Sequence, residues 1–267
     1  MFTALAAAAA LSFAPAQPDG LKLTNVRWTI GELGPTRKES KLIPGDLLFI
    51  GYDIENLTID ADGYAKYTMG MEVSDAAGKS IFKQDPRELT DFIPLRGNKL
   101  PARAFLVIGL DQPAGTYSCK LTVTDPKTKG TSSLAVKFEV TKPEFAILAV
   151  NTSYDEGGKL SAPTTGVVGQ TAYIHFSVAN FTRDPKTKQP NVEFLFETLD
   201  EAGKPTREKP TRYVQDGGIE EKDGAFSLRF PVFMSRTGKF TARITATDKV
   251  GNKKSVYELP LTILSSN

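Results

Sequence analysis

The sequence predicts an all-β protein made of two tandem seven-stranded β-sandwich domains that follow a signal peptide. Three observations predict this fold. Apolar residues alternate with polar ones in short runs, the runs are separated by Gly, Pro and Asp, and three segments of the chain occur twice. A chain of 267 residues is long enough for two domains, each with its own hydrophobic core.

The repeated segments share one order and an offset near 124 residues. Residues 45–57 return as 169–181, residues 71–79 as 196–204, and residues 115–125 as 238–248. Three matches in the same order indicate a duplicated domain rather than coincidence. We therefore expect domains over residues 17–141 and 145–264, joined by a short segment whose Pro143 makes the pair stiff.

Alternation at period two predicts which side chains face the interior of each sandwich. First strands are expected over residues 21–30 and 145–150. The inward positions expected in the first copy are Leu48, Ile50, Tyr52, Ile54, Tyr67, Met69, Met71, Val73, Phe105, Val107, Tyr117, Cys119, Leu121, Val123, Leu134, Val136, Phe138 and Val140. The matching positions of the second copy are Ala172, Ile174, Phe176, Val178, Phe194, Phe196, Phe226, Leu228, Phe230, Phe240, Ala242, Ile244, Ala246, Leu259, Leu261 and Ile263.

The N-terminal residues predict export. Residues 2–13 are apolar and rich in Ala and Leu, and Ala14-Pro15-Ala16 has the small-x-small pattern of a cleavage site. Residues 1–16 are therefore expected to be a signal peptide, although no Lys or Arg precedes the apolar run; the alternative is an Ala-rich helix. The run is shorter than the roughly 20 residues that span a bilayer. We expect a periplasmic, cell-surface or extracellular protein with no transmembrane segment in the mature chain.

The charge balance disfavours two classes of partner. The chain has 33 Lys and Arg against 31 Asp and Glu, for a net charge of +2, and the two signs are interspersed. This balance does not favour binding to nucleic acid or to an anionic membrane. The expected partner is a protein or a cell-surface polymer.

Two strands carry a family resemblance. Gly115-Thr-Tyr117 and Gly238-Lys-Phe240 resemble the Gly-x-Tyr corner of immunoglobulin-like and fibronectin type III-like domains. The Thr and Asp residues that end these strands look like the tandem repeats of exported bacterial surface proteins. Immunoglobulin domains pair a Cys on this strand with a second Cys, whereas Cys119 is the only cysteine and Ala242 stands at its repeat position. The resemblance implies an architecture and a class of role, but no ligand.

No catalytic, metal-binding or cofactor-binding residue is expected. His175 is the only histidine, and it alternates with Ile174 and Phe176, so it should face outward. Cys119 should be a buried and unreactive core residue. The carboxylates Asp75 and Asp200 lie in expected hairpin loops, each followed by Gly at a positive-φ position.

Two weaker motifs have competing interpretations. Asp60-Ala-Asp62-Gly63 resembles part of a calcium loop, and Asp125, Glu144 and Asp248 are the carboxylates that could hold calcium near the domain join. Solvated turns explain them more simply. Asn56, Asn151 and Asn180 begin Asn-x-Ser/Thr sequons, but Asn also suits a turn at the end of a strand.

Three functions remain open from the sequence. The leading one is a non-catalytic interaction or spacer module in the cell envelope or extracellular space. The alternative is a carbohydrate-binding accessory module. It is disfavoured because most aromatic residues are expected at inward positions, whereas sugar binding needs aromatic rings exposed together on one face. The third, ranked last, is an enzyme with a site of Asp, Glu, Lys and Tyr; the chain is expected not to be an enzyme.

Overall fold

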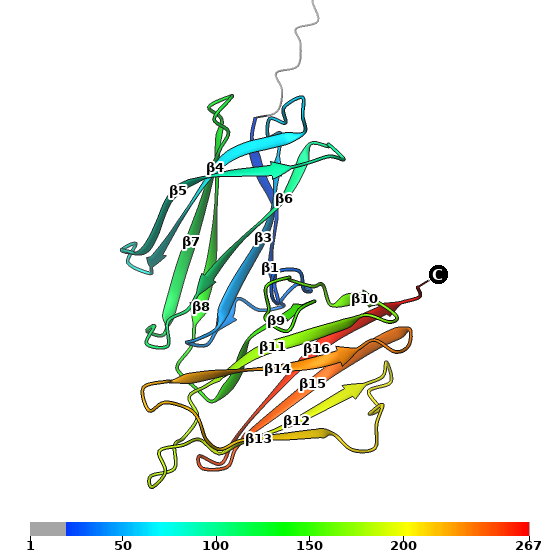
Figure 1. Ribbon diagram of the computed structural model, residues 1–267. Coiled ribbons are helices and arrows are strands. Elements are labelled where there is room, and N and C mark those ends of the chain that lie inside the picture. The colour runs from blue at the N-terminus through cyan, green and yellow to red at the C-terminus, as the bar shows by residue number, and fades with distance from the viewer. Residues whose placement is uncertain (1–19, 267) are drawn as a thin grey trace, which may run out of the picture.

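A computed structural model describes residues 20–266, all of whose regular structure is β-strand (Figure 1). The predicted signal peptide, residues 1–16, lies outside the described residues. We call β1–β8 the first unit and β9–β16 the second unit. The strands of the first unit are β1 (Lys22–Thr29), β2 (Lys41–Leu42), β3 (Leu47–Glu55), β4 (Tyr64–Asp75), β5 (Ser80–Phe92), β6 (Lys99–Val107), β7 (Gly115–Thr124) and β8 (Thr131–Val140). Those of the second are β9 (Ala146–Ser153), β10 (Thr165–Val167), β11 (Thr171–Ala179), β12 (Val192–Leu199), β13 (Thr211–Gln215), β14 (Ala225–Phe233), β15 (Gly238–Asp248) and β16 (Lys253–Leu264).

Each unit contains a three-stranded and a five-stranded sheet with the same strand order. The first unit has the sheets β1-β3-β6 and β2-β8-β7-β4-β5, and the second has β9-β11-β14 and β10-β16-β15-β12-β13. The prediction of an all-β fold built from β-sandwich sheets is confirmed. Each unit has eight strands rather than about seven, because β2 and β10 are short extra strands that pair in parallel with β8 and β16.

The apolar residues form two separate cores. One cluster of buried side chains extends over residues 42–140 and the other over residues 145–263, and they share no residue. Most predicted inward positions are buried; Tyr52, Cys119, Phe176 and Phe194 are at most 1% exposed. Burial of large side chains on both sheets supplies the main favourable free energy for such a fold.

The predicted inward orientation of Phe105 and Val107 is wrong. These side chains are 61% and 62% exposed, whereas Ala102, Ala104 and Leu106 face the interior. Two of the four inner positions of β6 carry alanine, and the large apolar Phe105 and Val107 lie on its outer face. Hydrophobicity alone therefore predicts the wrong alternate set of residues as buried. Their assumed counterparts Phe226, Leu228 and Phe230 do pack against the second core.

The predicted hairpin loops are confirmed. Gly78 and Gly203 have φ values of 81° and 78°, a region that glycine enters without steric cost. Asp75 Oδ1 accepts hydrogen bonds from the backbone N–H groups of Ala77 (3.0 Å) and Lys79 (2.9 Å), and Asp200 makes the equivalent bonds. Both carboxylates thus stabilise their own turns.

Candidate functional site

The two units meet at a buried carboxylate. Asp46, 5% exposed, lies just before β3 and accepts hydrogen bonds at Oδ1 from the backbone N–H groups of Leu47 (2.9 Å) and Ala149 (2.8 Å). Its Oδ2 accepts a bond from Arg37 Nη2 at 2.8 Å. Ala149 belongs to β9 of the second unit and has a φ of 54°, where the pairing of β9 with β11 shifts register. One carboxylate therefore binds both units.

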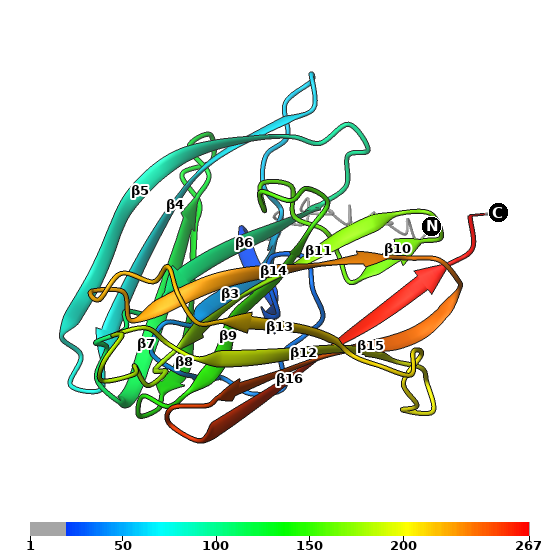
Figure 2. The same cartoon turned by 60° about the horizontal axis from the view of Figure 1, so that its bottom comes forward.

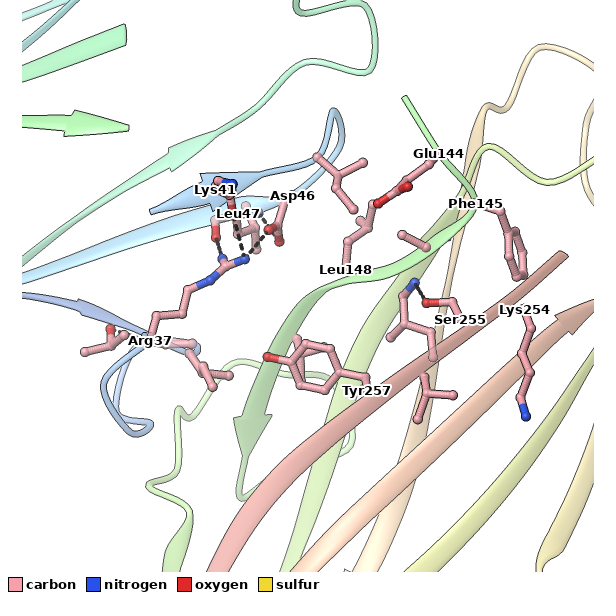
Figure 3. A pocket seen from close by; sticks show the side chains of 18 residues that line it. Arg37, Lys41, Asp46, Leu47, Glu144, Phe145, Leu148, Lys254, Ser255 and Tyr257 are labelled. Atoms are coloured by element: carbon pink, nitrogen blue, oxygen red, sulfur yellow. Dashed lines mark hydrogen bonds and ion pairs between the residues drawn. The ribbon is translucent and has the colours of Figure 1, made fainter. Parts of the chain in front are cut away.

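A polar cleft of about 440 Å³ lies beside this carboxylate (Figure 3). Arg37 and Lys41 line it from the first unit, and Lys254 and Tyr257 line it from β16. Arg37 also donates to the carbonyl oxygen of Lys41 at 3.3 Å. Burial raises the pKa of Tyr257 to about 12; the cation of Arg37 opposes this change and the anion of Asp46 adds to it. The phenol is neutral at physiological pH and can act as a hydrogen-bond donor.

A second carboxylate joins the units on another side. Glu32 accepts a hydrogen bond from Ser161 Oγ in the second unit and from Arg103 Nη1 (2.6 Å) in β6. The Ser161 hydrogen bond is the largest cause of a lowered Glu32 pKa; burial acts in the opposite direction and Arg103 lowers the pKa further. With Asp46, this contact restrains the relative orientation of the two units through hydrogen bonds from two separate loop segments of the first unit.

An exposed apolar surface lies next to this junction. Leu47 is paired with Val107 and Phe49 with Phe105 on the outer face of β3 and β6, and the two phenyl ring centroids are 6.1 Å apart. We call these four residues the outer-face strip. A hollow of about 400 Å³ extends from Phe49 and Phe105 to Asn151 of the second unit. Exposed apolar surface of this kind marks many interaction sites.

His175 lies on the outer face of its sheet, as predicted. Its Nε2 is 2.7 Å from Ser153 Oγ, on the neighbouring strand β9. Burial is the largest cause of a lowered His175 pKa; a backbone hydrogen bond and the charge of Asp155 act against it, while the cation of Arg229 adds to it. Cys119 is buried, as predicted, and burial raises its thiol pKa to about 12.

The suspected calcium ligands at the join have structural partners instead. Asp125 Oδ2 accepts hydrogen bonds from Thr58 N (3.1 Å) and Thr58 Oγ1 (2.6 Å), and Asp248 Oδ2 accepts one from Thr182 N (2.8 Å). Asp60 caps its own turn by accepting from Tyr64 N at 2.8 Å. Within residues 20–266, no three His, Cys, Asp or Glu side chains lie close enough together to hold a metal ion.

Two of the three sequons occupy turns of special backbone conformation. Asn56 and Asn180 have φ values of 62° and 58°, and their side-chain amides donate to the carbonyl oxygens of Gly20 (3.3 Å) and Glu144 (2.9 Å). Asn adopts this left-handed region more readily than most residues. Asn151 instead lies within β9.

The sequence does not point to Asp46, Arg37, Tyr257 or the outer-face strip as site residues. One signal for Asp46 exists in the repeat, because the corresponding residue is the uncharged Gln170. Gln170 accepts a bond only from Val167 N nearby (2.8 Å) at its side-chain oxygen. The carboxylate of Asp46, which Gln170 lacks, therefore indicates a contact that only the first unit makes.

No protein-family model and no curated protein matches the chain. Among solved structures, the chain is similar to the transglutaminase of red sea bream, with 12% sequence identity and a TM-score of 0.28. The similarity covers 93% of this chain and 32% of the transglutaminase.

This comparison corrects one prediction. The chain was expected not to be an enzyme, and the similar solved structure is that of an enzyme, so the exclusion of enzymes is withdrawn. A TM-score of 0.28 carries no argument about the activity of this chain. In the described part of the chain, no helix is long and apolar enough to cross a membrane.

Proposed function

We propose that the chain is an exported interaction or spacer module that holds two β-sandwich units at a fixed orientation in the cell envelope or extracellular space. The observation that carries this proposal is the hydrogen bond between Ala149 N and the buried carboxylate of Asp46. Bending that broke this contact would leave the partly buried N–H of Ala149 without its acceptor, so bending at the junction is costly. The signal-peptide pattern of residues 1–16 supports export.

The units are proposed to be tandem immunoglobulin-like repeats of the exported bacterial type. Tyr117 Oη donates to the carbonyl oxygen of Pro113 at 2.7 Å and accepts a bond from Gln112 Nε2. A tyrosine hydroxyl bonded to backbone a few residues upstream is the tyrosine corner of immunoglobulin-like sandwiches. This contact supports the resemblance inferred from Gly115-Thr-Tyr117.

The proposed partner is a protein that covers the outer-face strip with an apolar surface of its own. Aromatic side chains at the centre of an interface contribute much of its binding free energy. Phe49 and Phe105 lie together, and Arg103, which pairs with Glu32, provides a polar border. The strip also lies against the junction, so a partner can contact both units at once.

Capture from extracts of the producing organism tests this role. Phe105→Asp should abolish recovery of a partner that the wild-type protein retains, because a charge would be placed in the apolar interface. Phe92→Asp is the matched control: Phe92 is 59% exposed on β5, an edge strand of the other sheet. Equal recovery by the two variants would contradict the role of the strip.

A carbohydrate-binding function is the second candidate, and one observation favours it. Tyr64 and Phe92 are both exposed, with ring centroids 5.1 Å apart, on β4 and β5. Aromatic faces of this kind can stack on sugar rings. Binding on a glycan array that is lost in Phe92→Ala and kept in Phe105→Ala would support this second function over the first.

A further inference from the structure

The two units differ in a groove between their sheets. In the first unit the groove lies between the end of β6 and the start of β7. In the second unit it lies between the end of β14 and the start of β15. Tyr117 and Phe138 line it in the first unit, and Phe240 and Leu261 take the equivalent places in the second. Its volume is about 180 Å³ in the first unit and about 610 Å³ in the second.

The first unit narrows its groove with side chains of its own edge strand. The strand β5 extends for 13 residues alongside β4 (Figure 2), and Ile81 and Phe82 at its start line the groove. Phe82 is paired with Val73 of β4. An aromatic side chain from an extended edge strand, 42% exposed, therefore covers part of the groove and narrows it.

The second unit has no equivalent of Phe82. Thr198 takes the place of Val73, and its carbonyl oxygen accepts a bond from Thr206 N at 2.8 Å. The strand β13 begins only at Thr211 and has five residues, so Thr206 and Arg207 stand where the first unit has apolar side chains. The wider groove follows from this substitution and from the shorter strand.

The open groove combines an apolar floor with a cationic border. Its floor includes Val232, Phe240, Leu261 and Ile263, and Phe233 at its mouth is 63% exposed. The border is formed by Arg207 and Arg236. Arg207 Nη2 donates to Thr211 Oγ1 at 2.8 Å, and the guanidinium of Arg236 lies 5.1 Å from the centroid of the Phe240 ring. Neither arginine forms an ion pair with a carboxylate of residues 20–266.

We propose that this groove binds an extended acidic peptide of a partner protein, with an aromatic side chain flanked by carboxylates. The aromatic ring takes the place that Phe82 takes in the first unit, and the carboxylates contact Arg207 and Arg236. Arginine binds carboxylates through two parallel N–H···O bonds, which adds orientation to affinity. This site lies apart from the outer-face strip and does not depend on the role proposed for it.

Peptide titration tests the charge and the ring separately. The probes are acetylated, amidated pentapeptides with the sequences Gly-Glu-Phe-Glu-Gly, Gly-Gln-Phe-Gln-Gly and Gly-Glu-Ala-Glu-Gly. Binding is measured from the backbone amide chemical shifts of residues 17–267 as each peptide is added. The first is expected to perturb residues of the groove saturably, with a Kd below about 1 mM. The other two are expected to bind at least about tenfold more weakly. Binding of the first should also weaken as the salt concentration rises.

Two substitutions complete the test. Thr206→Phe should narrow the groove, as Phe82 narrows that of the first unit, and prevent binding. Arg236→Gln should weaken binding by about tenfold. Arg87→Gln, on β5 of the first unit, is the matched control and should bind as wild type does. The proposal is overturned if the Glu-Phe-Glu peptide does not bind, if it binds no better than the Gln-Phe-Gln peptide, or if neither groove substitution affects it. Unchanged amide spectra outside the groove verify that each variant is folded.

Discussion

Asp125 holds Thr58 from across the first unit, through one bond to its backbone N–H and one to its hydroxyl. The same Asp125 accepts bonds from the N–H groups of Lys127 and Thr128 in its own turn. Asp248 and Thr182 repeat the contact in the second unit. In the first unit this Asp fixes the turn after β3 to the end of β7. In the second unit its counterpart fixes the turn after β11 to the end of β15.

Replacing Asp125 should destabilise the first unit strongly. Asp125→Ala leaves buried N–H groups without an acceptor, so we expect the unfolding free energy to fall by about 3 kcal/mol. Urea unfolding measures this change. Asp184→Ala is the matched control, because Asp184 begins the same Asp-Pro-Lys-Thr-Lys turn but caps only that turn. A loss of similar size in both variants would show that the turn, rather than Thr58, accounts for the effect.

The same carboxylate should make stability depend on pH in acid. Burial raises the pKa of Asp125, but the hydrogen bonds from Thr58 and from backbone N–H groups outweigh it and hold the pKa below its usual value. A lowered folded pKa contributes stability that is present above the unfolded value, about 3.9, and lost as the pH falls through the folded value. The unfolding free energy of wild type should therefore fall more steeply below about pH 4 than that of Asp125→Asn. Parallel pH profiles would contradict this assignment.

Removing the junction carboxylate should free the two units from each other. In Asp46→Ala the N–H of Ala149 loses its acceptor and Arg37 loses its ion partner. We expect a broader distribution of interunit orientations, measured by small-angle scattering and residual dipolar couplings, with both cores intact. Asp85→Ala, on exposed β5, serves as the control and should leave the orientation unchanged. An unaltered distribution in Asp46→Ala would contradict the proposed role of this residue.

The sequon asparagines should behave as turn residues. Asn180 has a φ of 58°, which disfavours Ala but not Gly. Asn180→Ala should lower the unfolding free energy by about 1 kcal/mol more than Asn180→Gly, because both variants lose the bond to Glu144 and only Ala adds backbone strain. Thermal unfolding of the two variants compares them directly. Equal stability would remove the backbone explanation for Asn at this position.

Cys119 should react with thiol reagents only when the first unit unfolds. Burial raises its pKa to about 12, and the thiolate is the nucleophile. Labelling by iodoacetamide at pH 8 is expected to follow the unfolding equilibrium as urea is added. Rapid labelling of the native protein would show that this strand opens locally.

The sequence was sufficient for the repeat, the inner faces of most strands and the hairpin turns, because alternation and turn residues are local signals. It did not predict β5, most of whose side chains are exposed, since an edge strand of this kind has little apolar alternation. The hydrophobic pattern predicts the wrong face for Phe105, because two inner positions of β6 carry alanine while Phe105 and Val107 on the outer face are larger and more apolar. Asp46 and the second-unit groove depend on contacts between distant segments, which no local pattern contains.

The short strand β13 has a consequence for how a duplicated protein diversifies. In the first unit Phe82 of the long strand β5 lines a groove of only about 180 Å³. In the second unit the groove is about 610 Å³ and the buried core beside it is intact, so a bound side chain would not have to displace core residues. Two units with the same strand order can therefore differ in the width of this groove, and so in what each can bind.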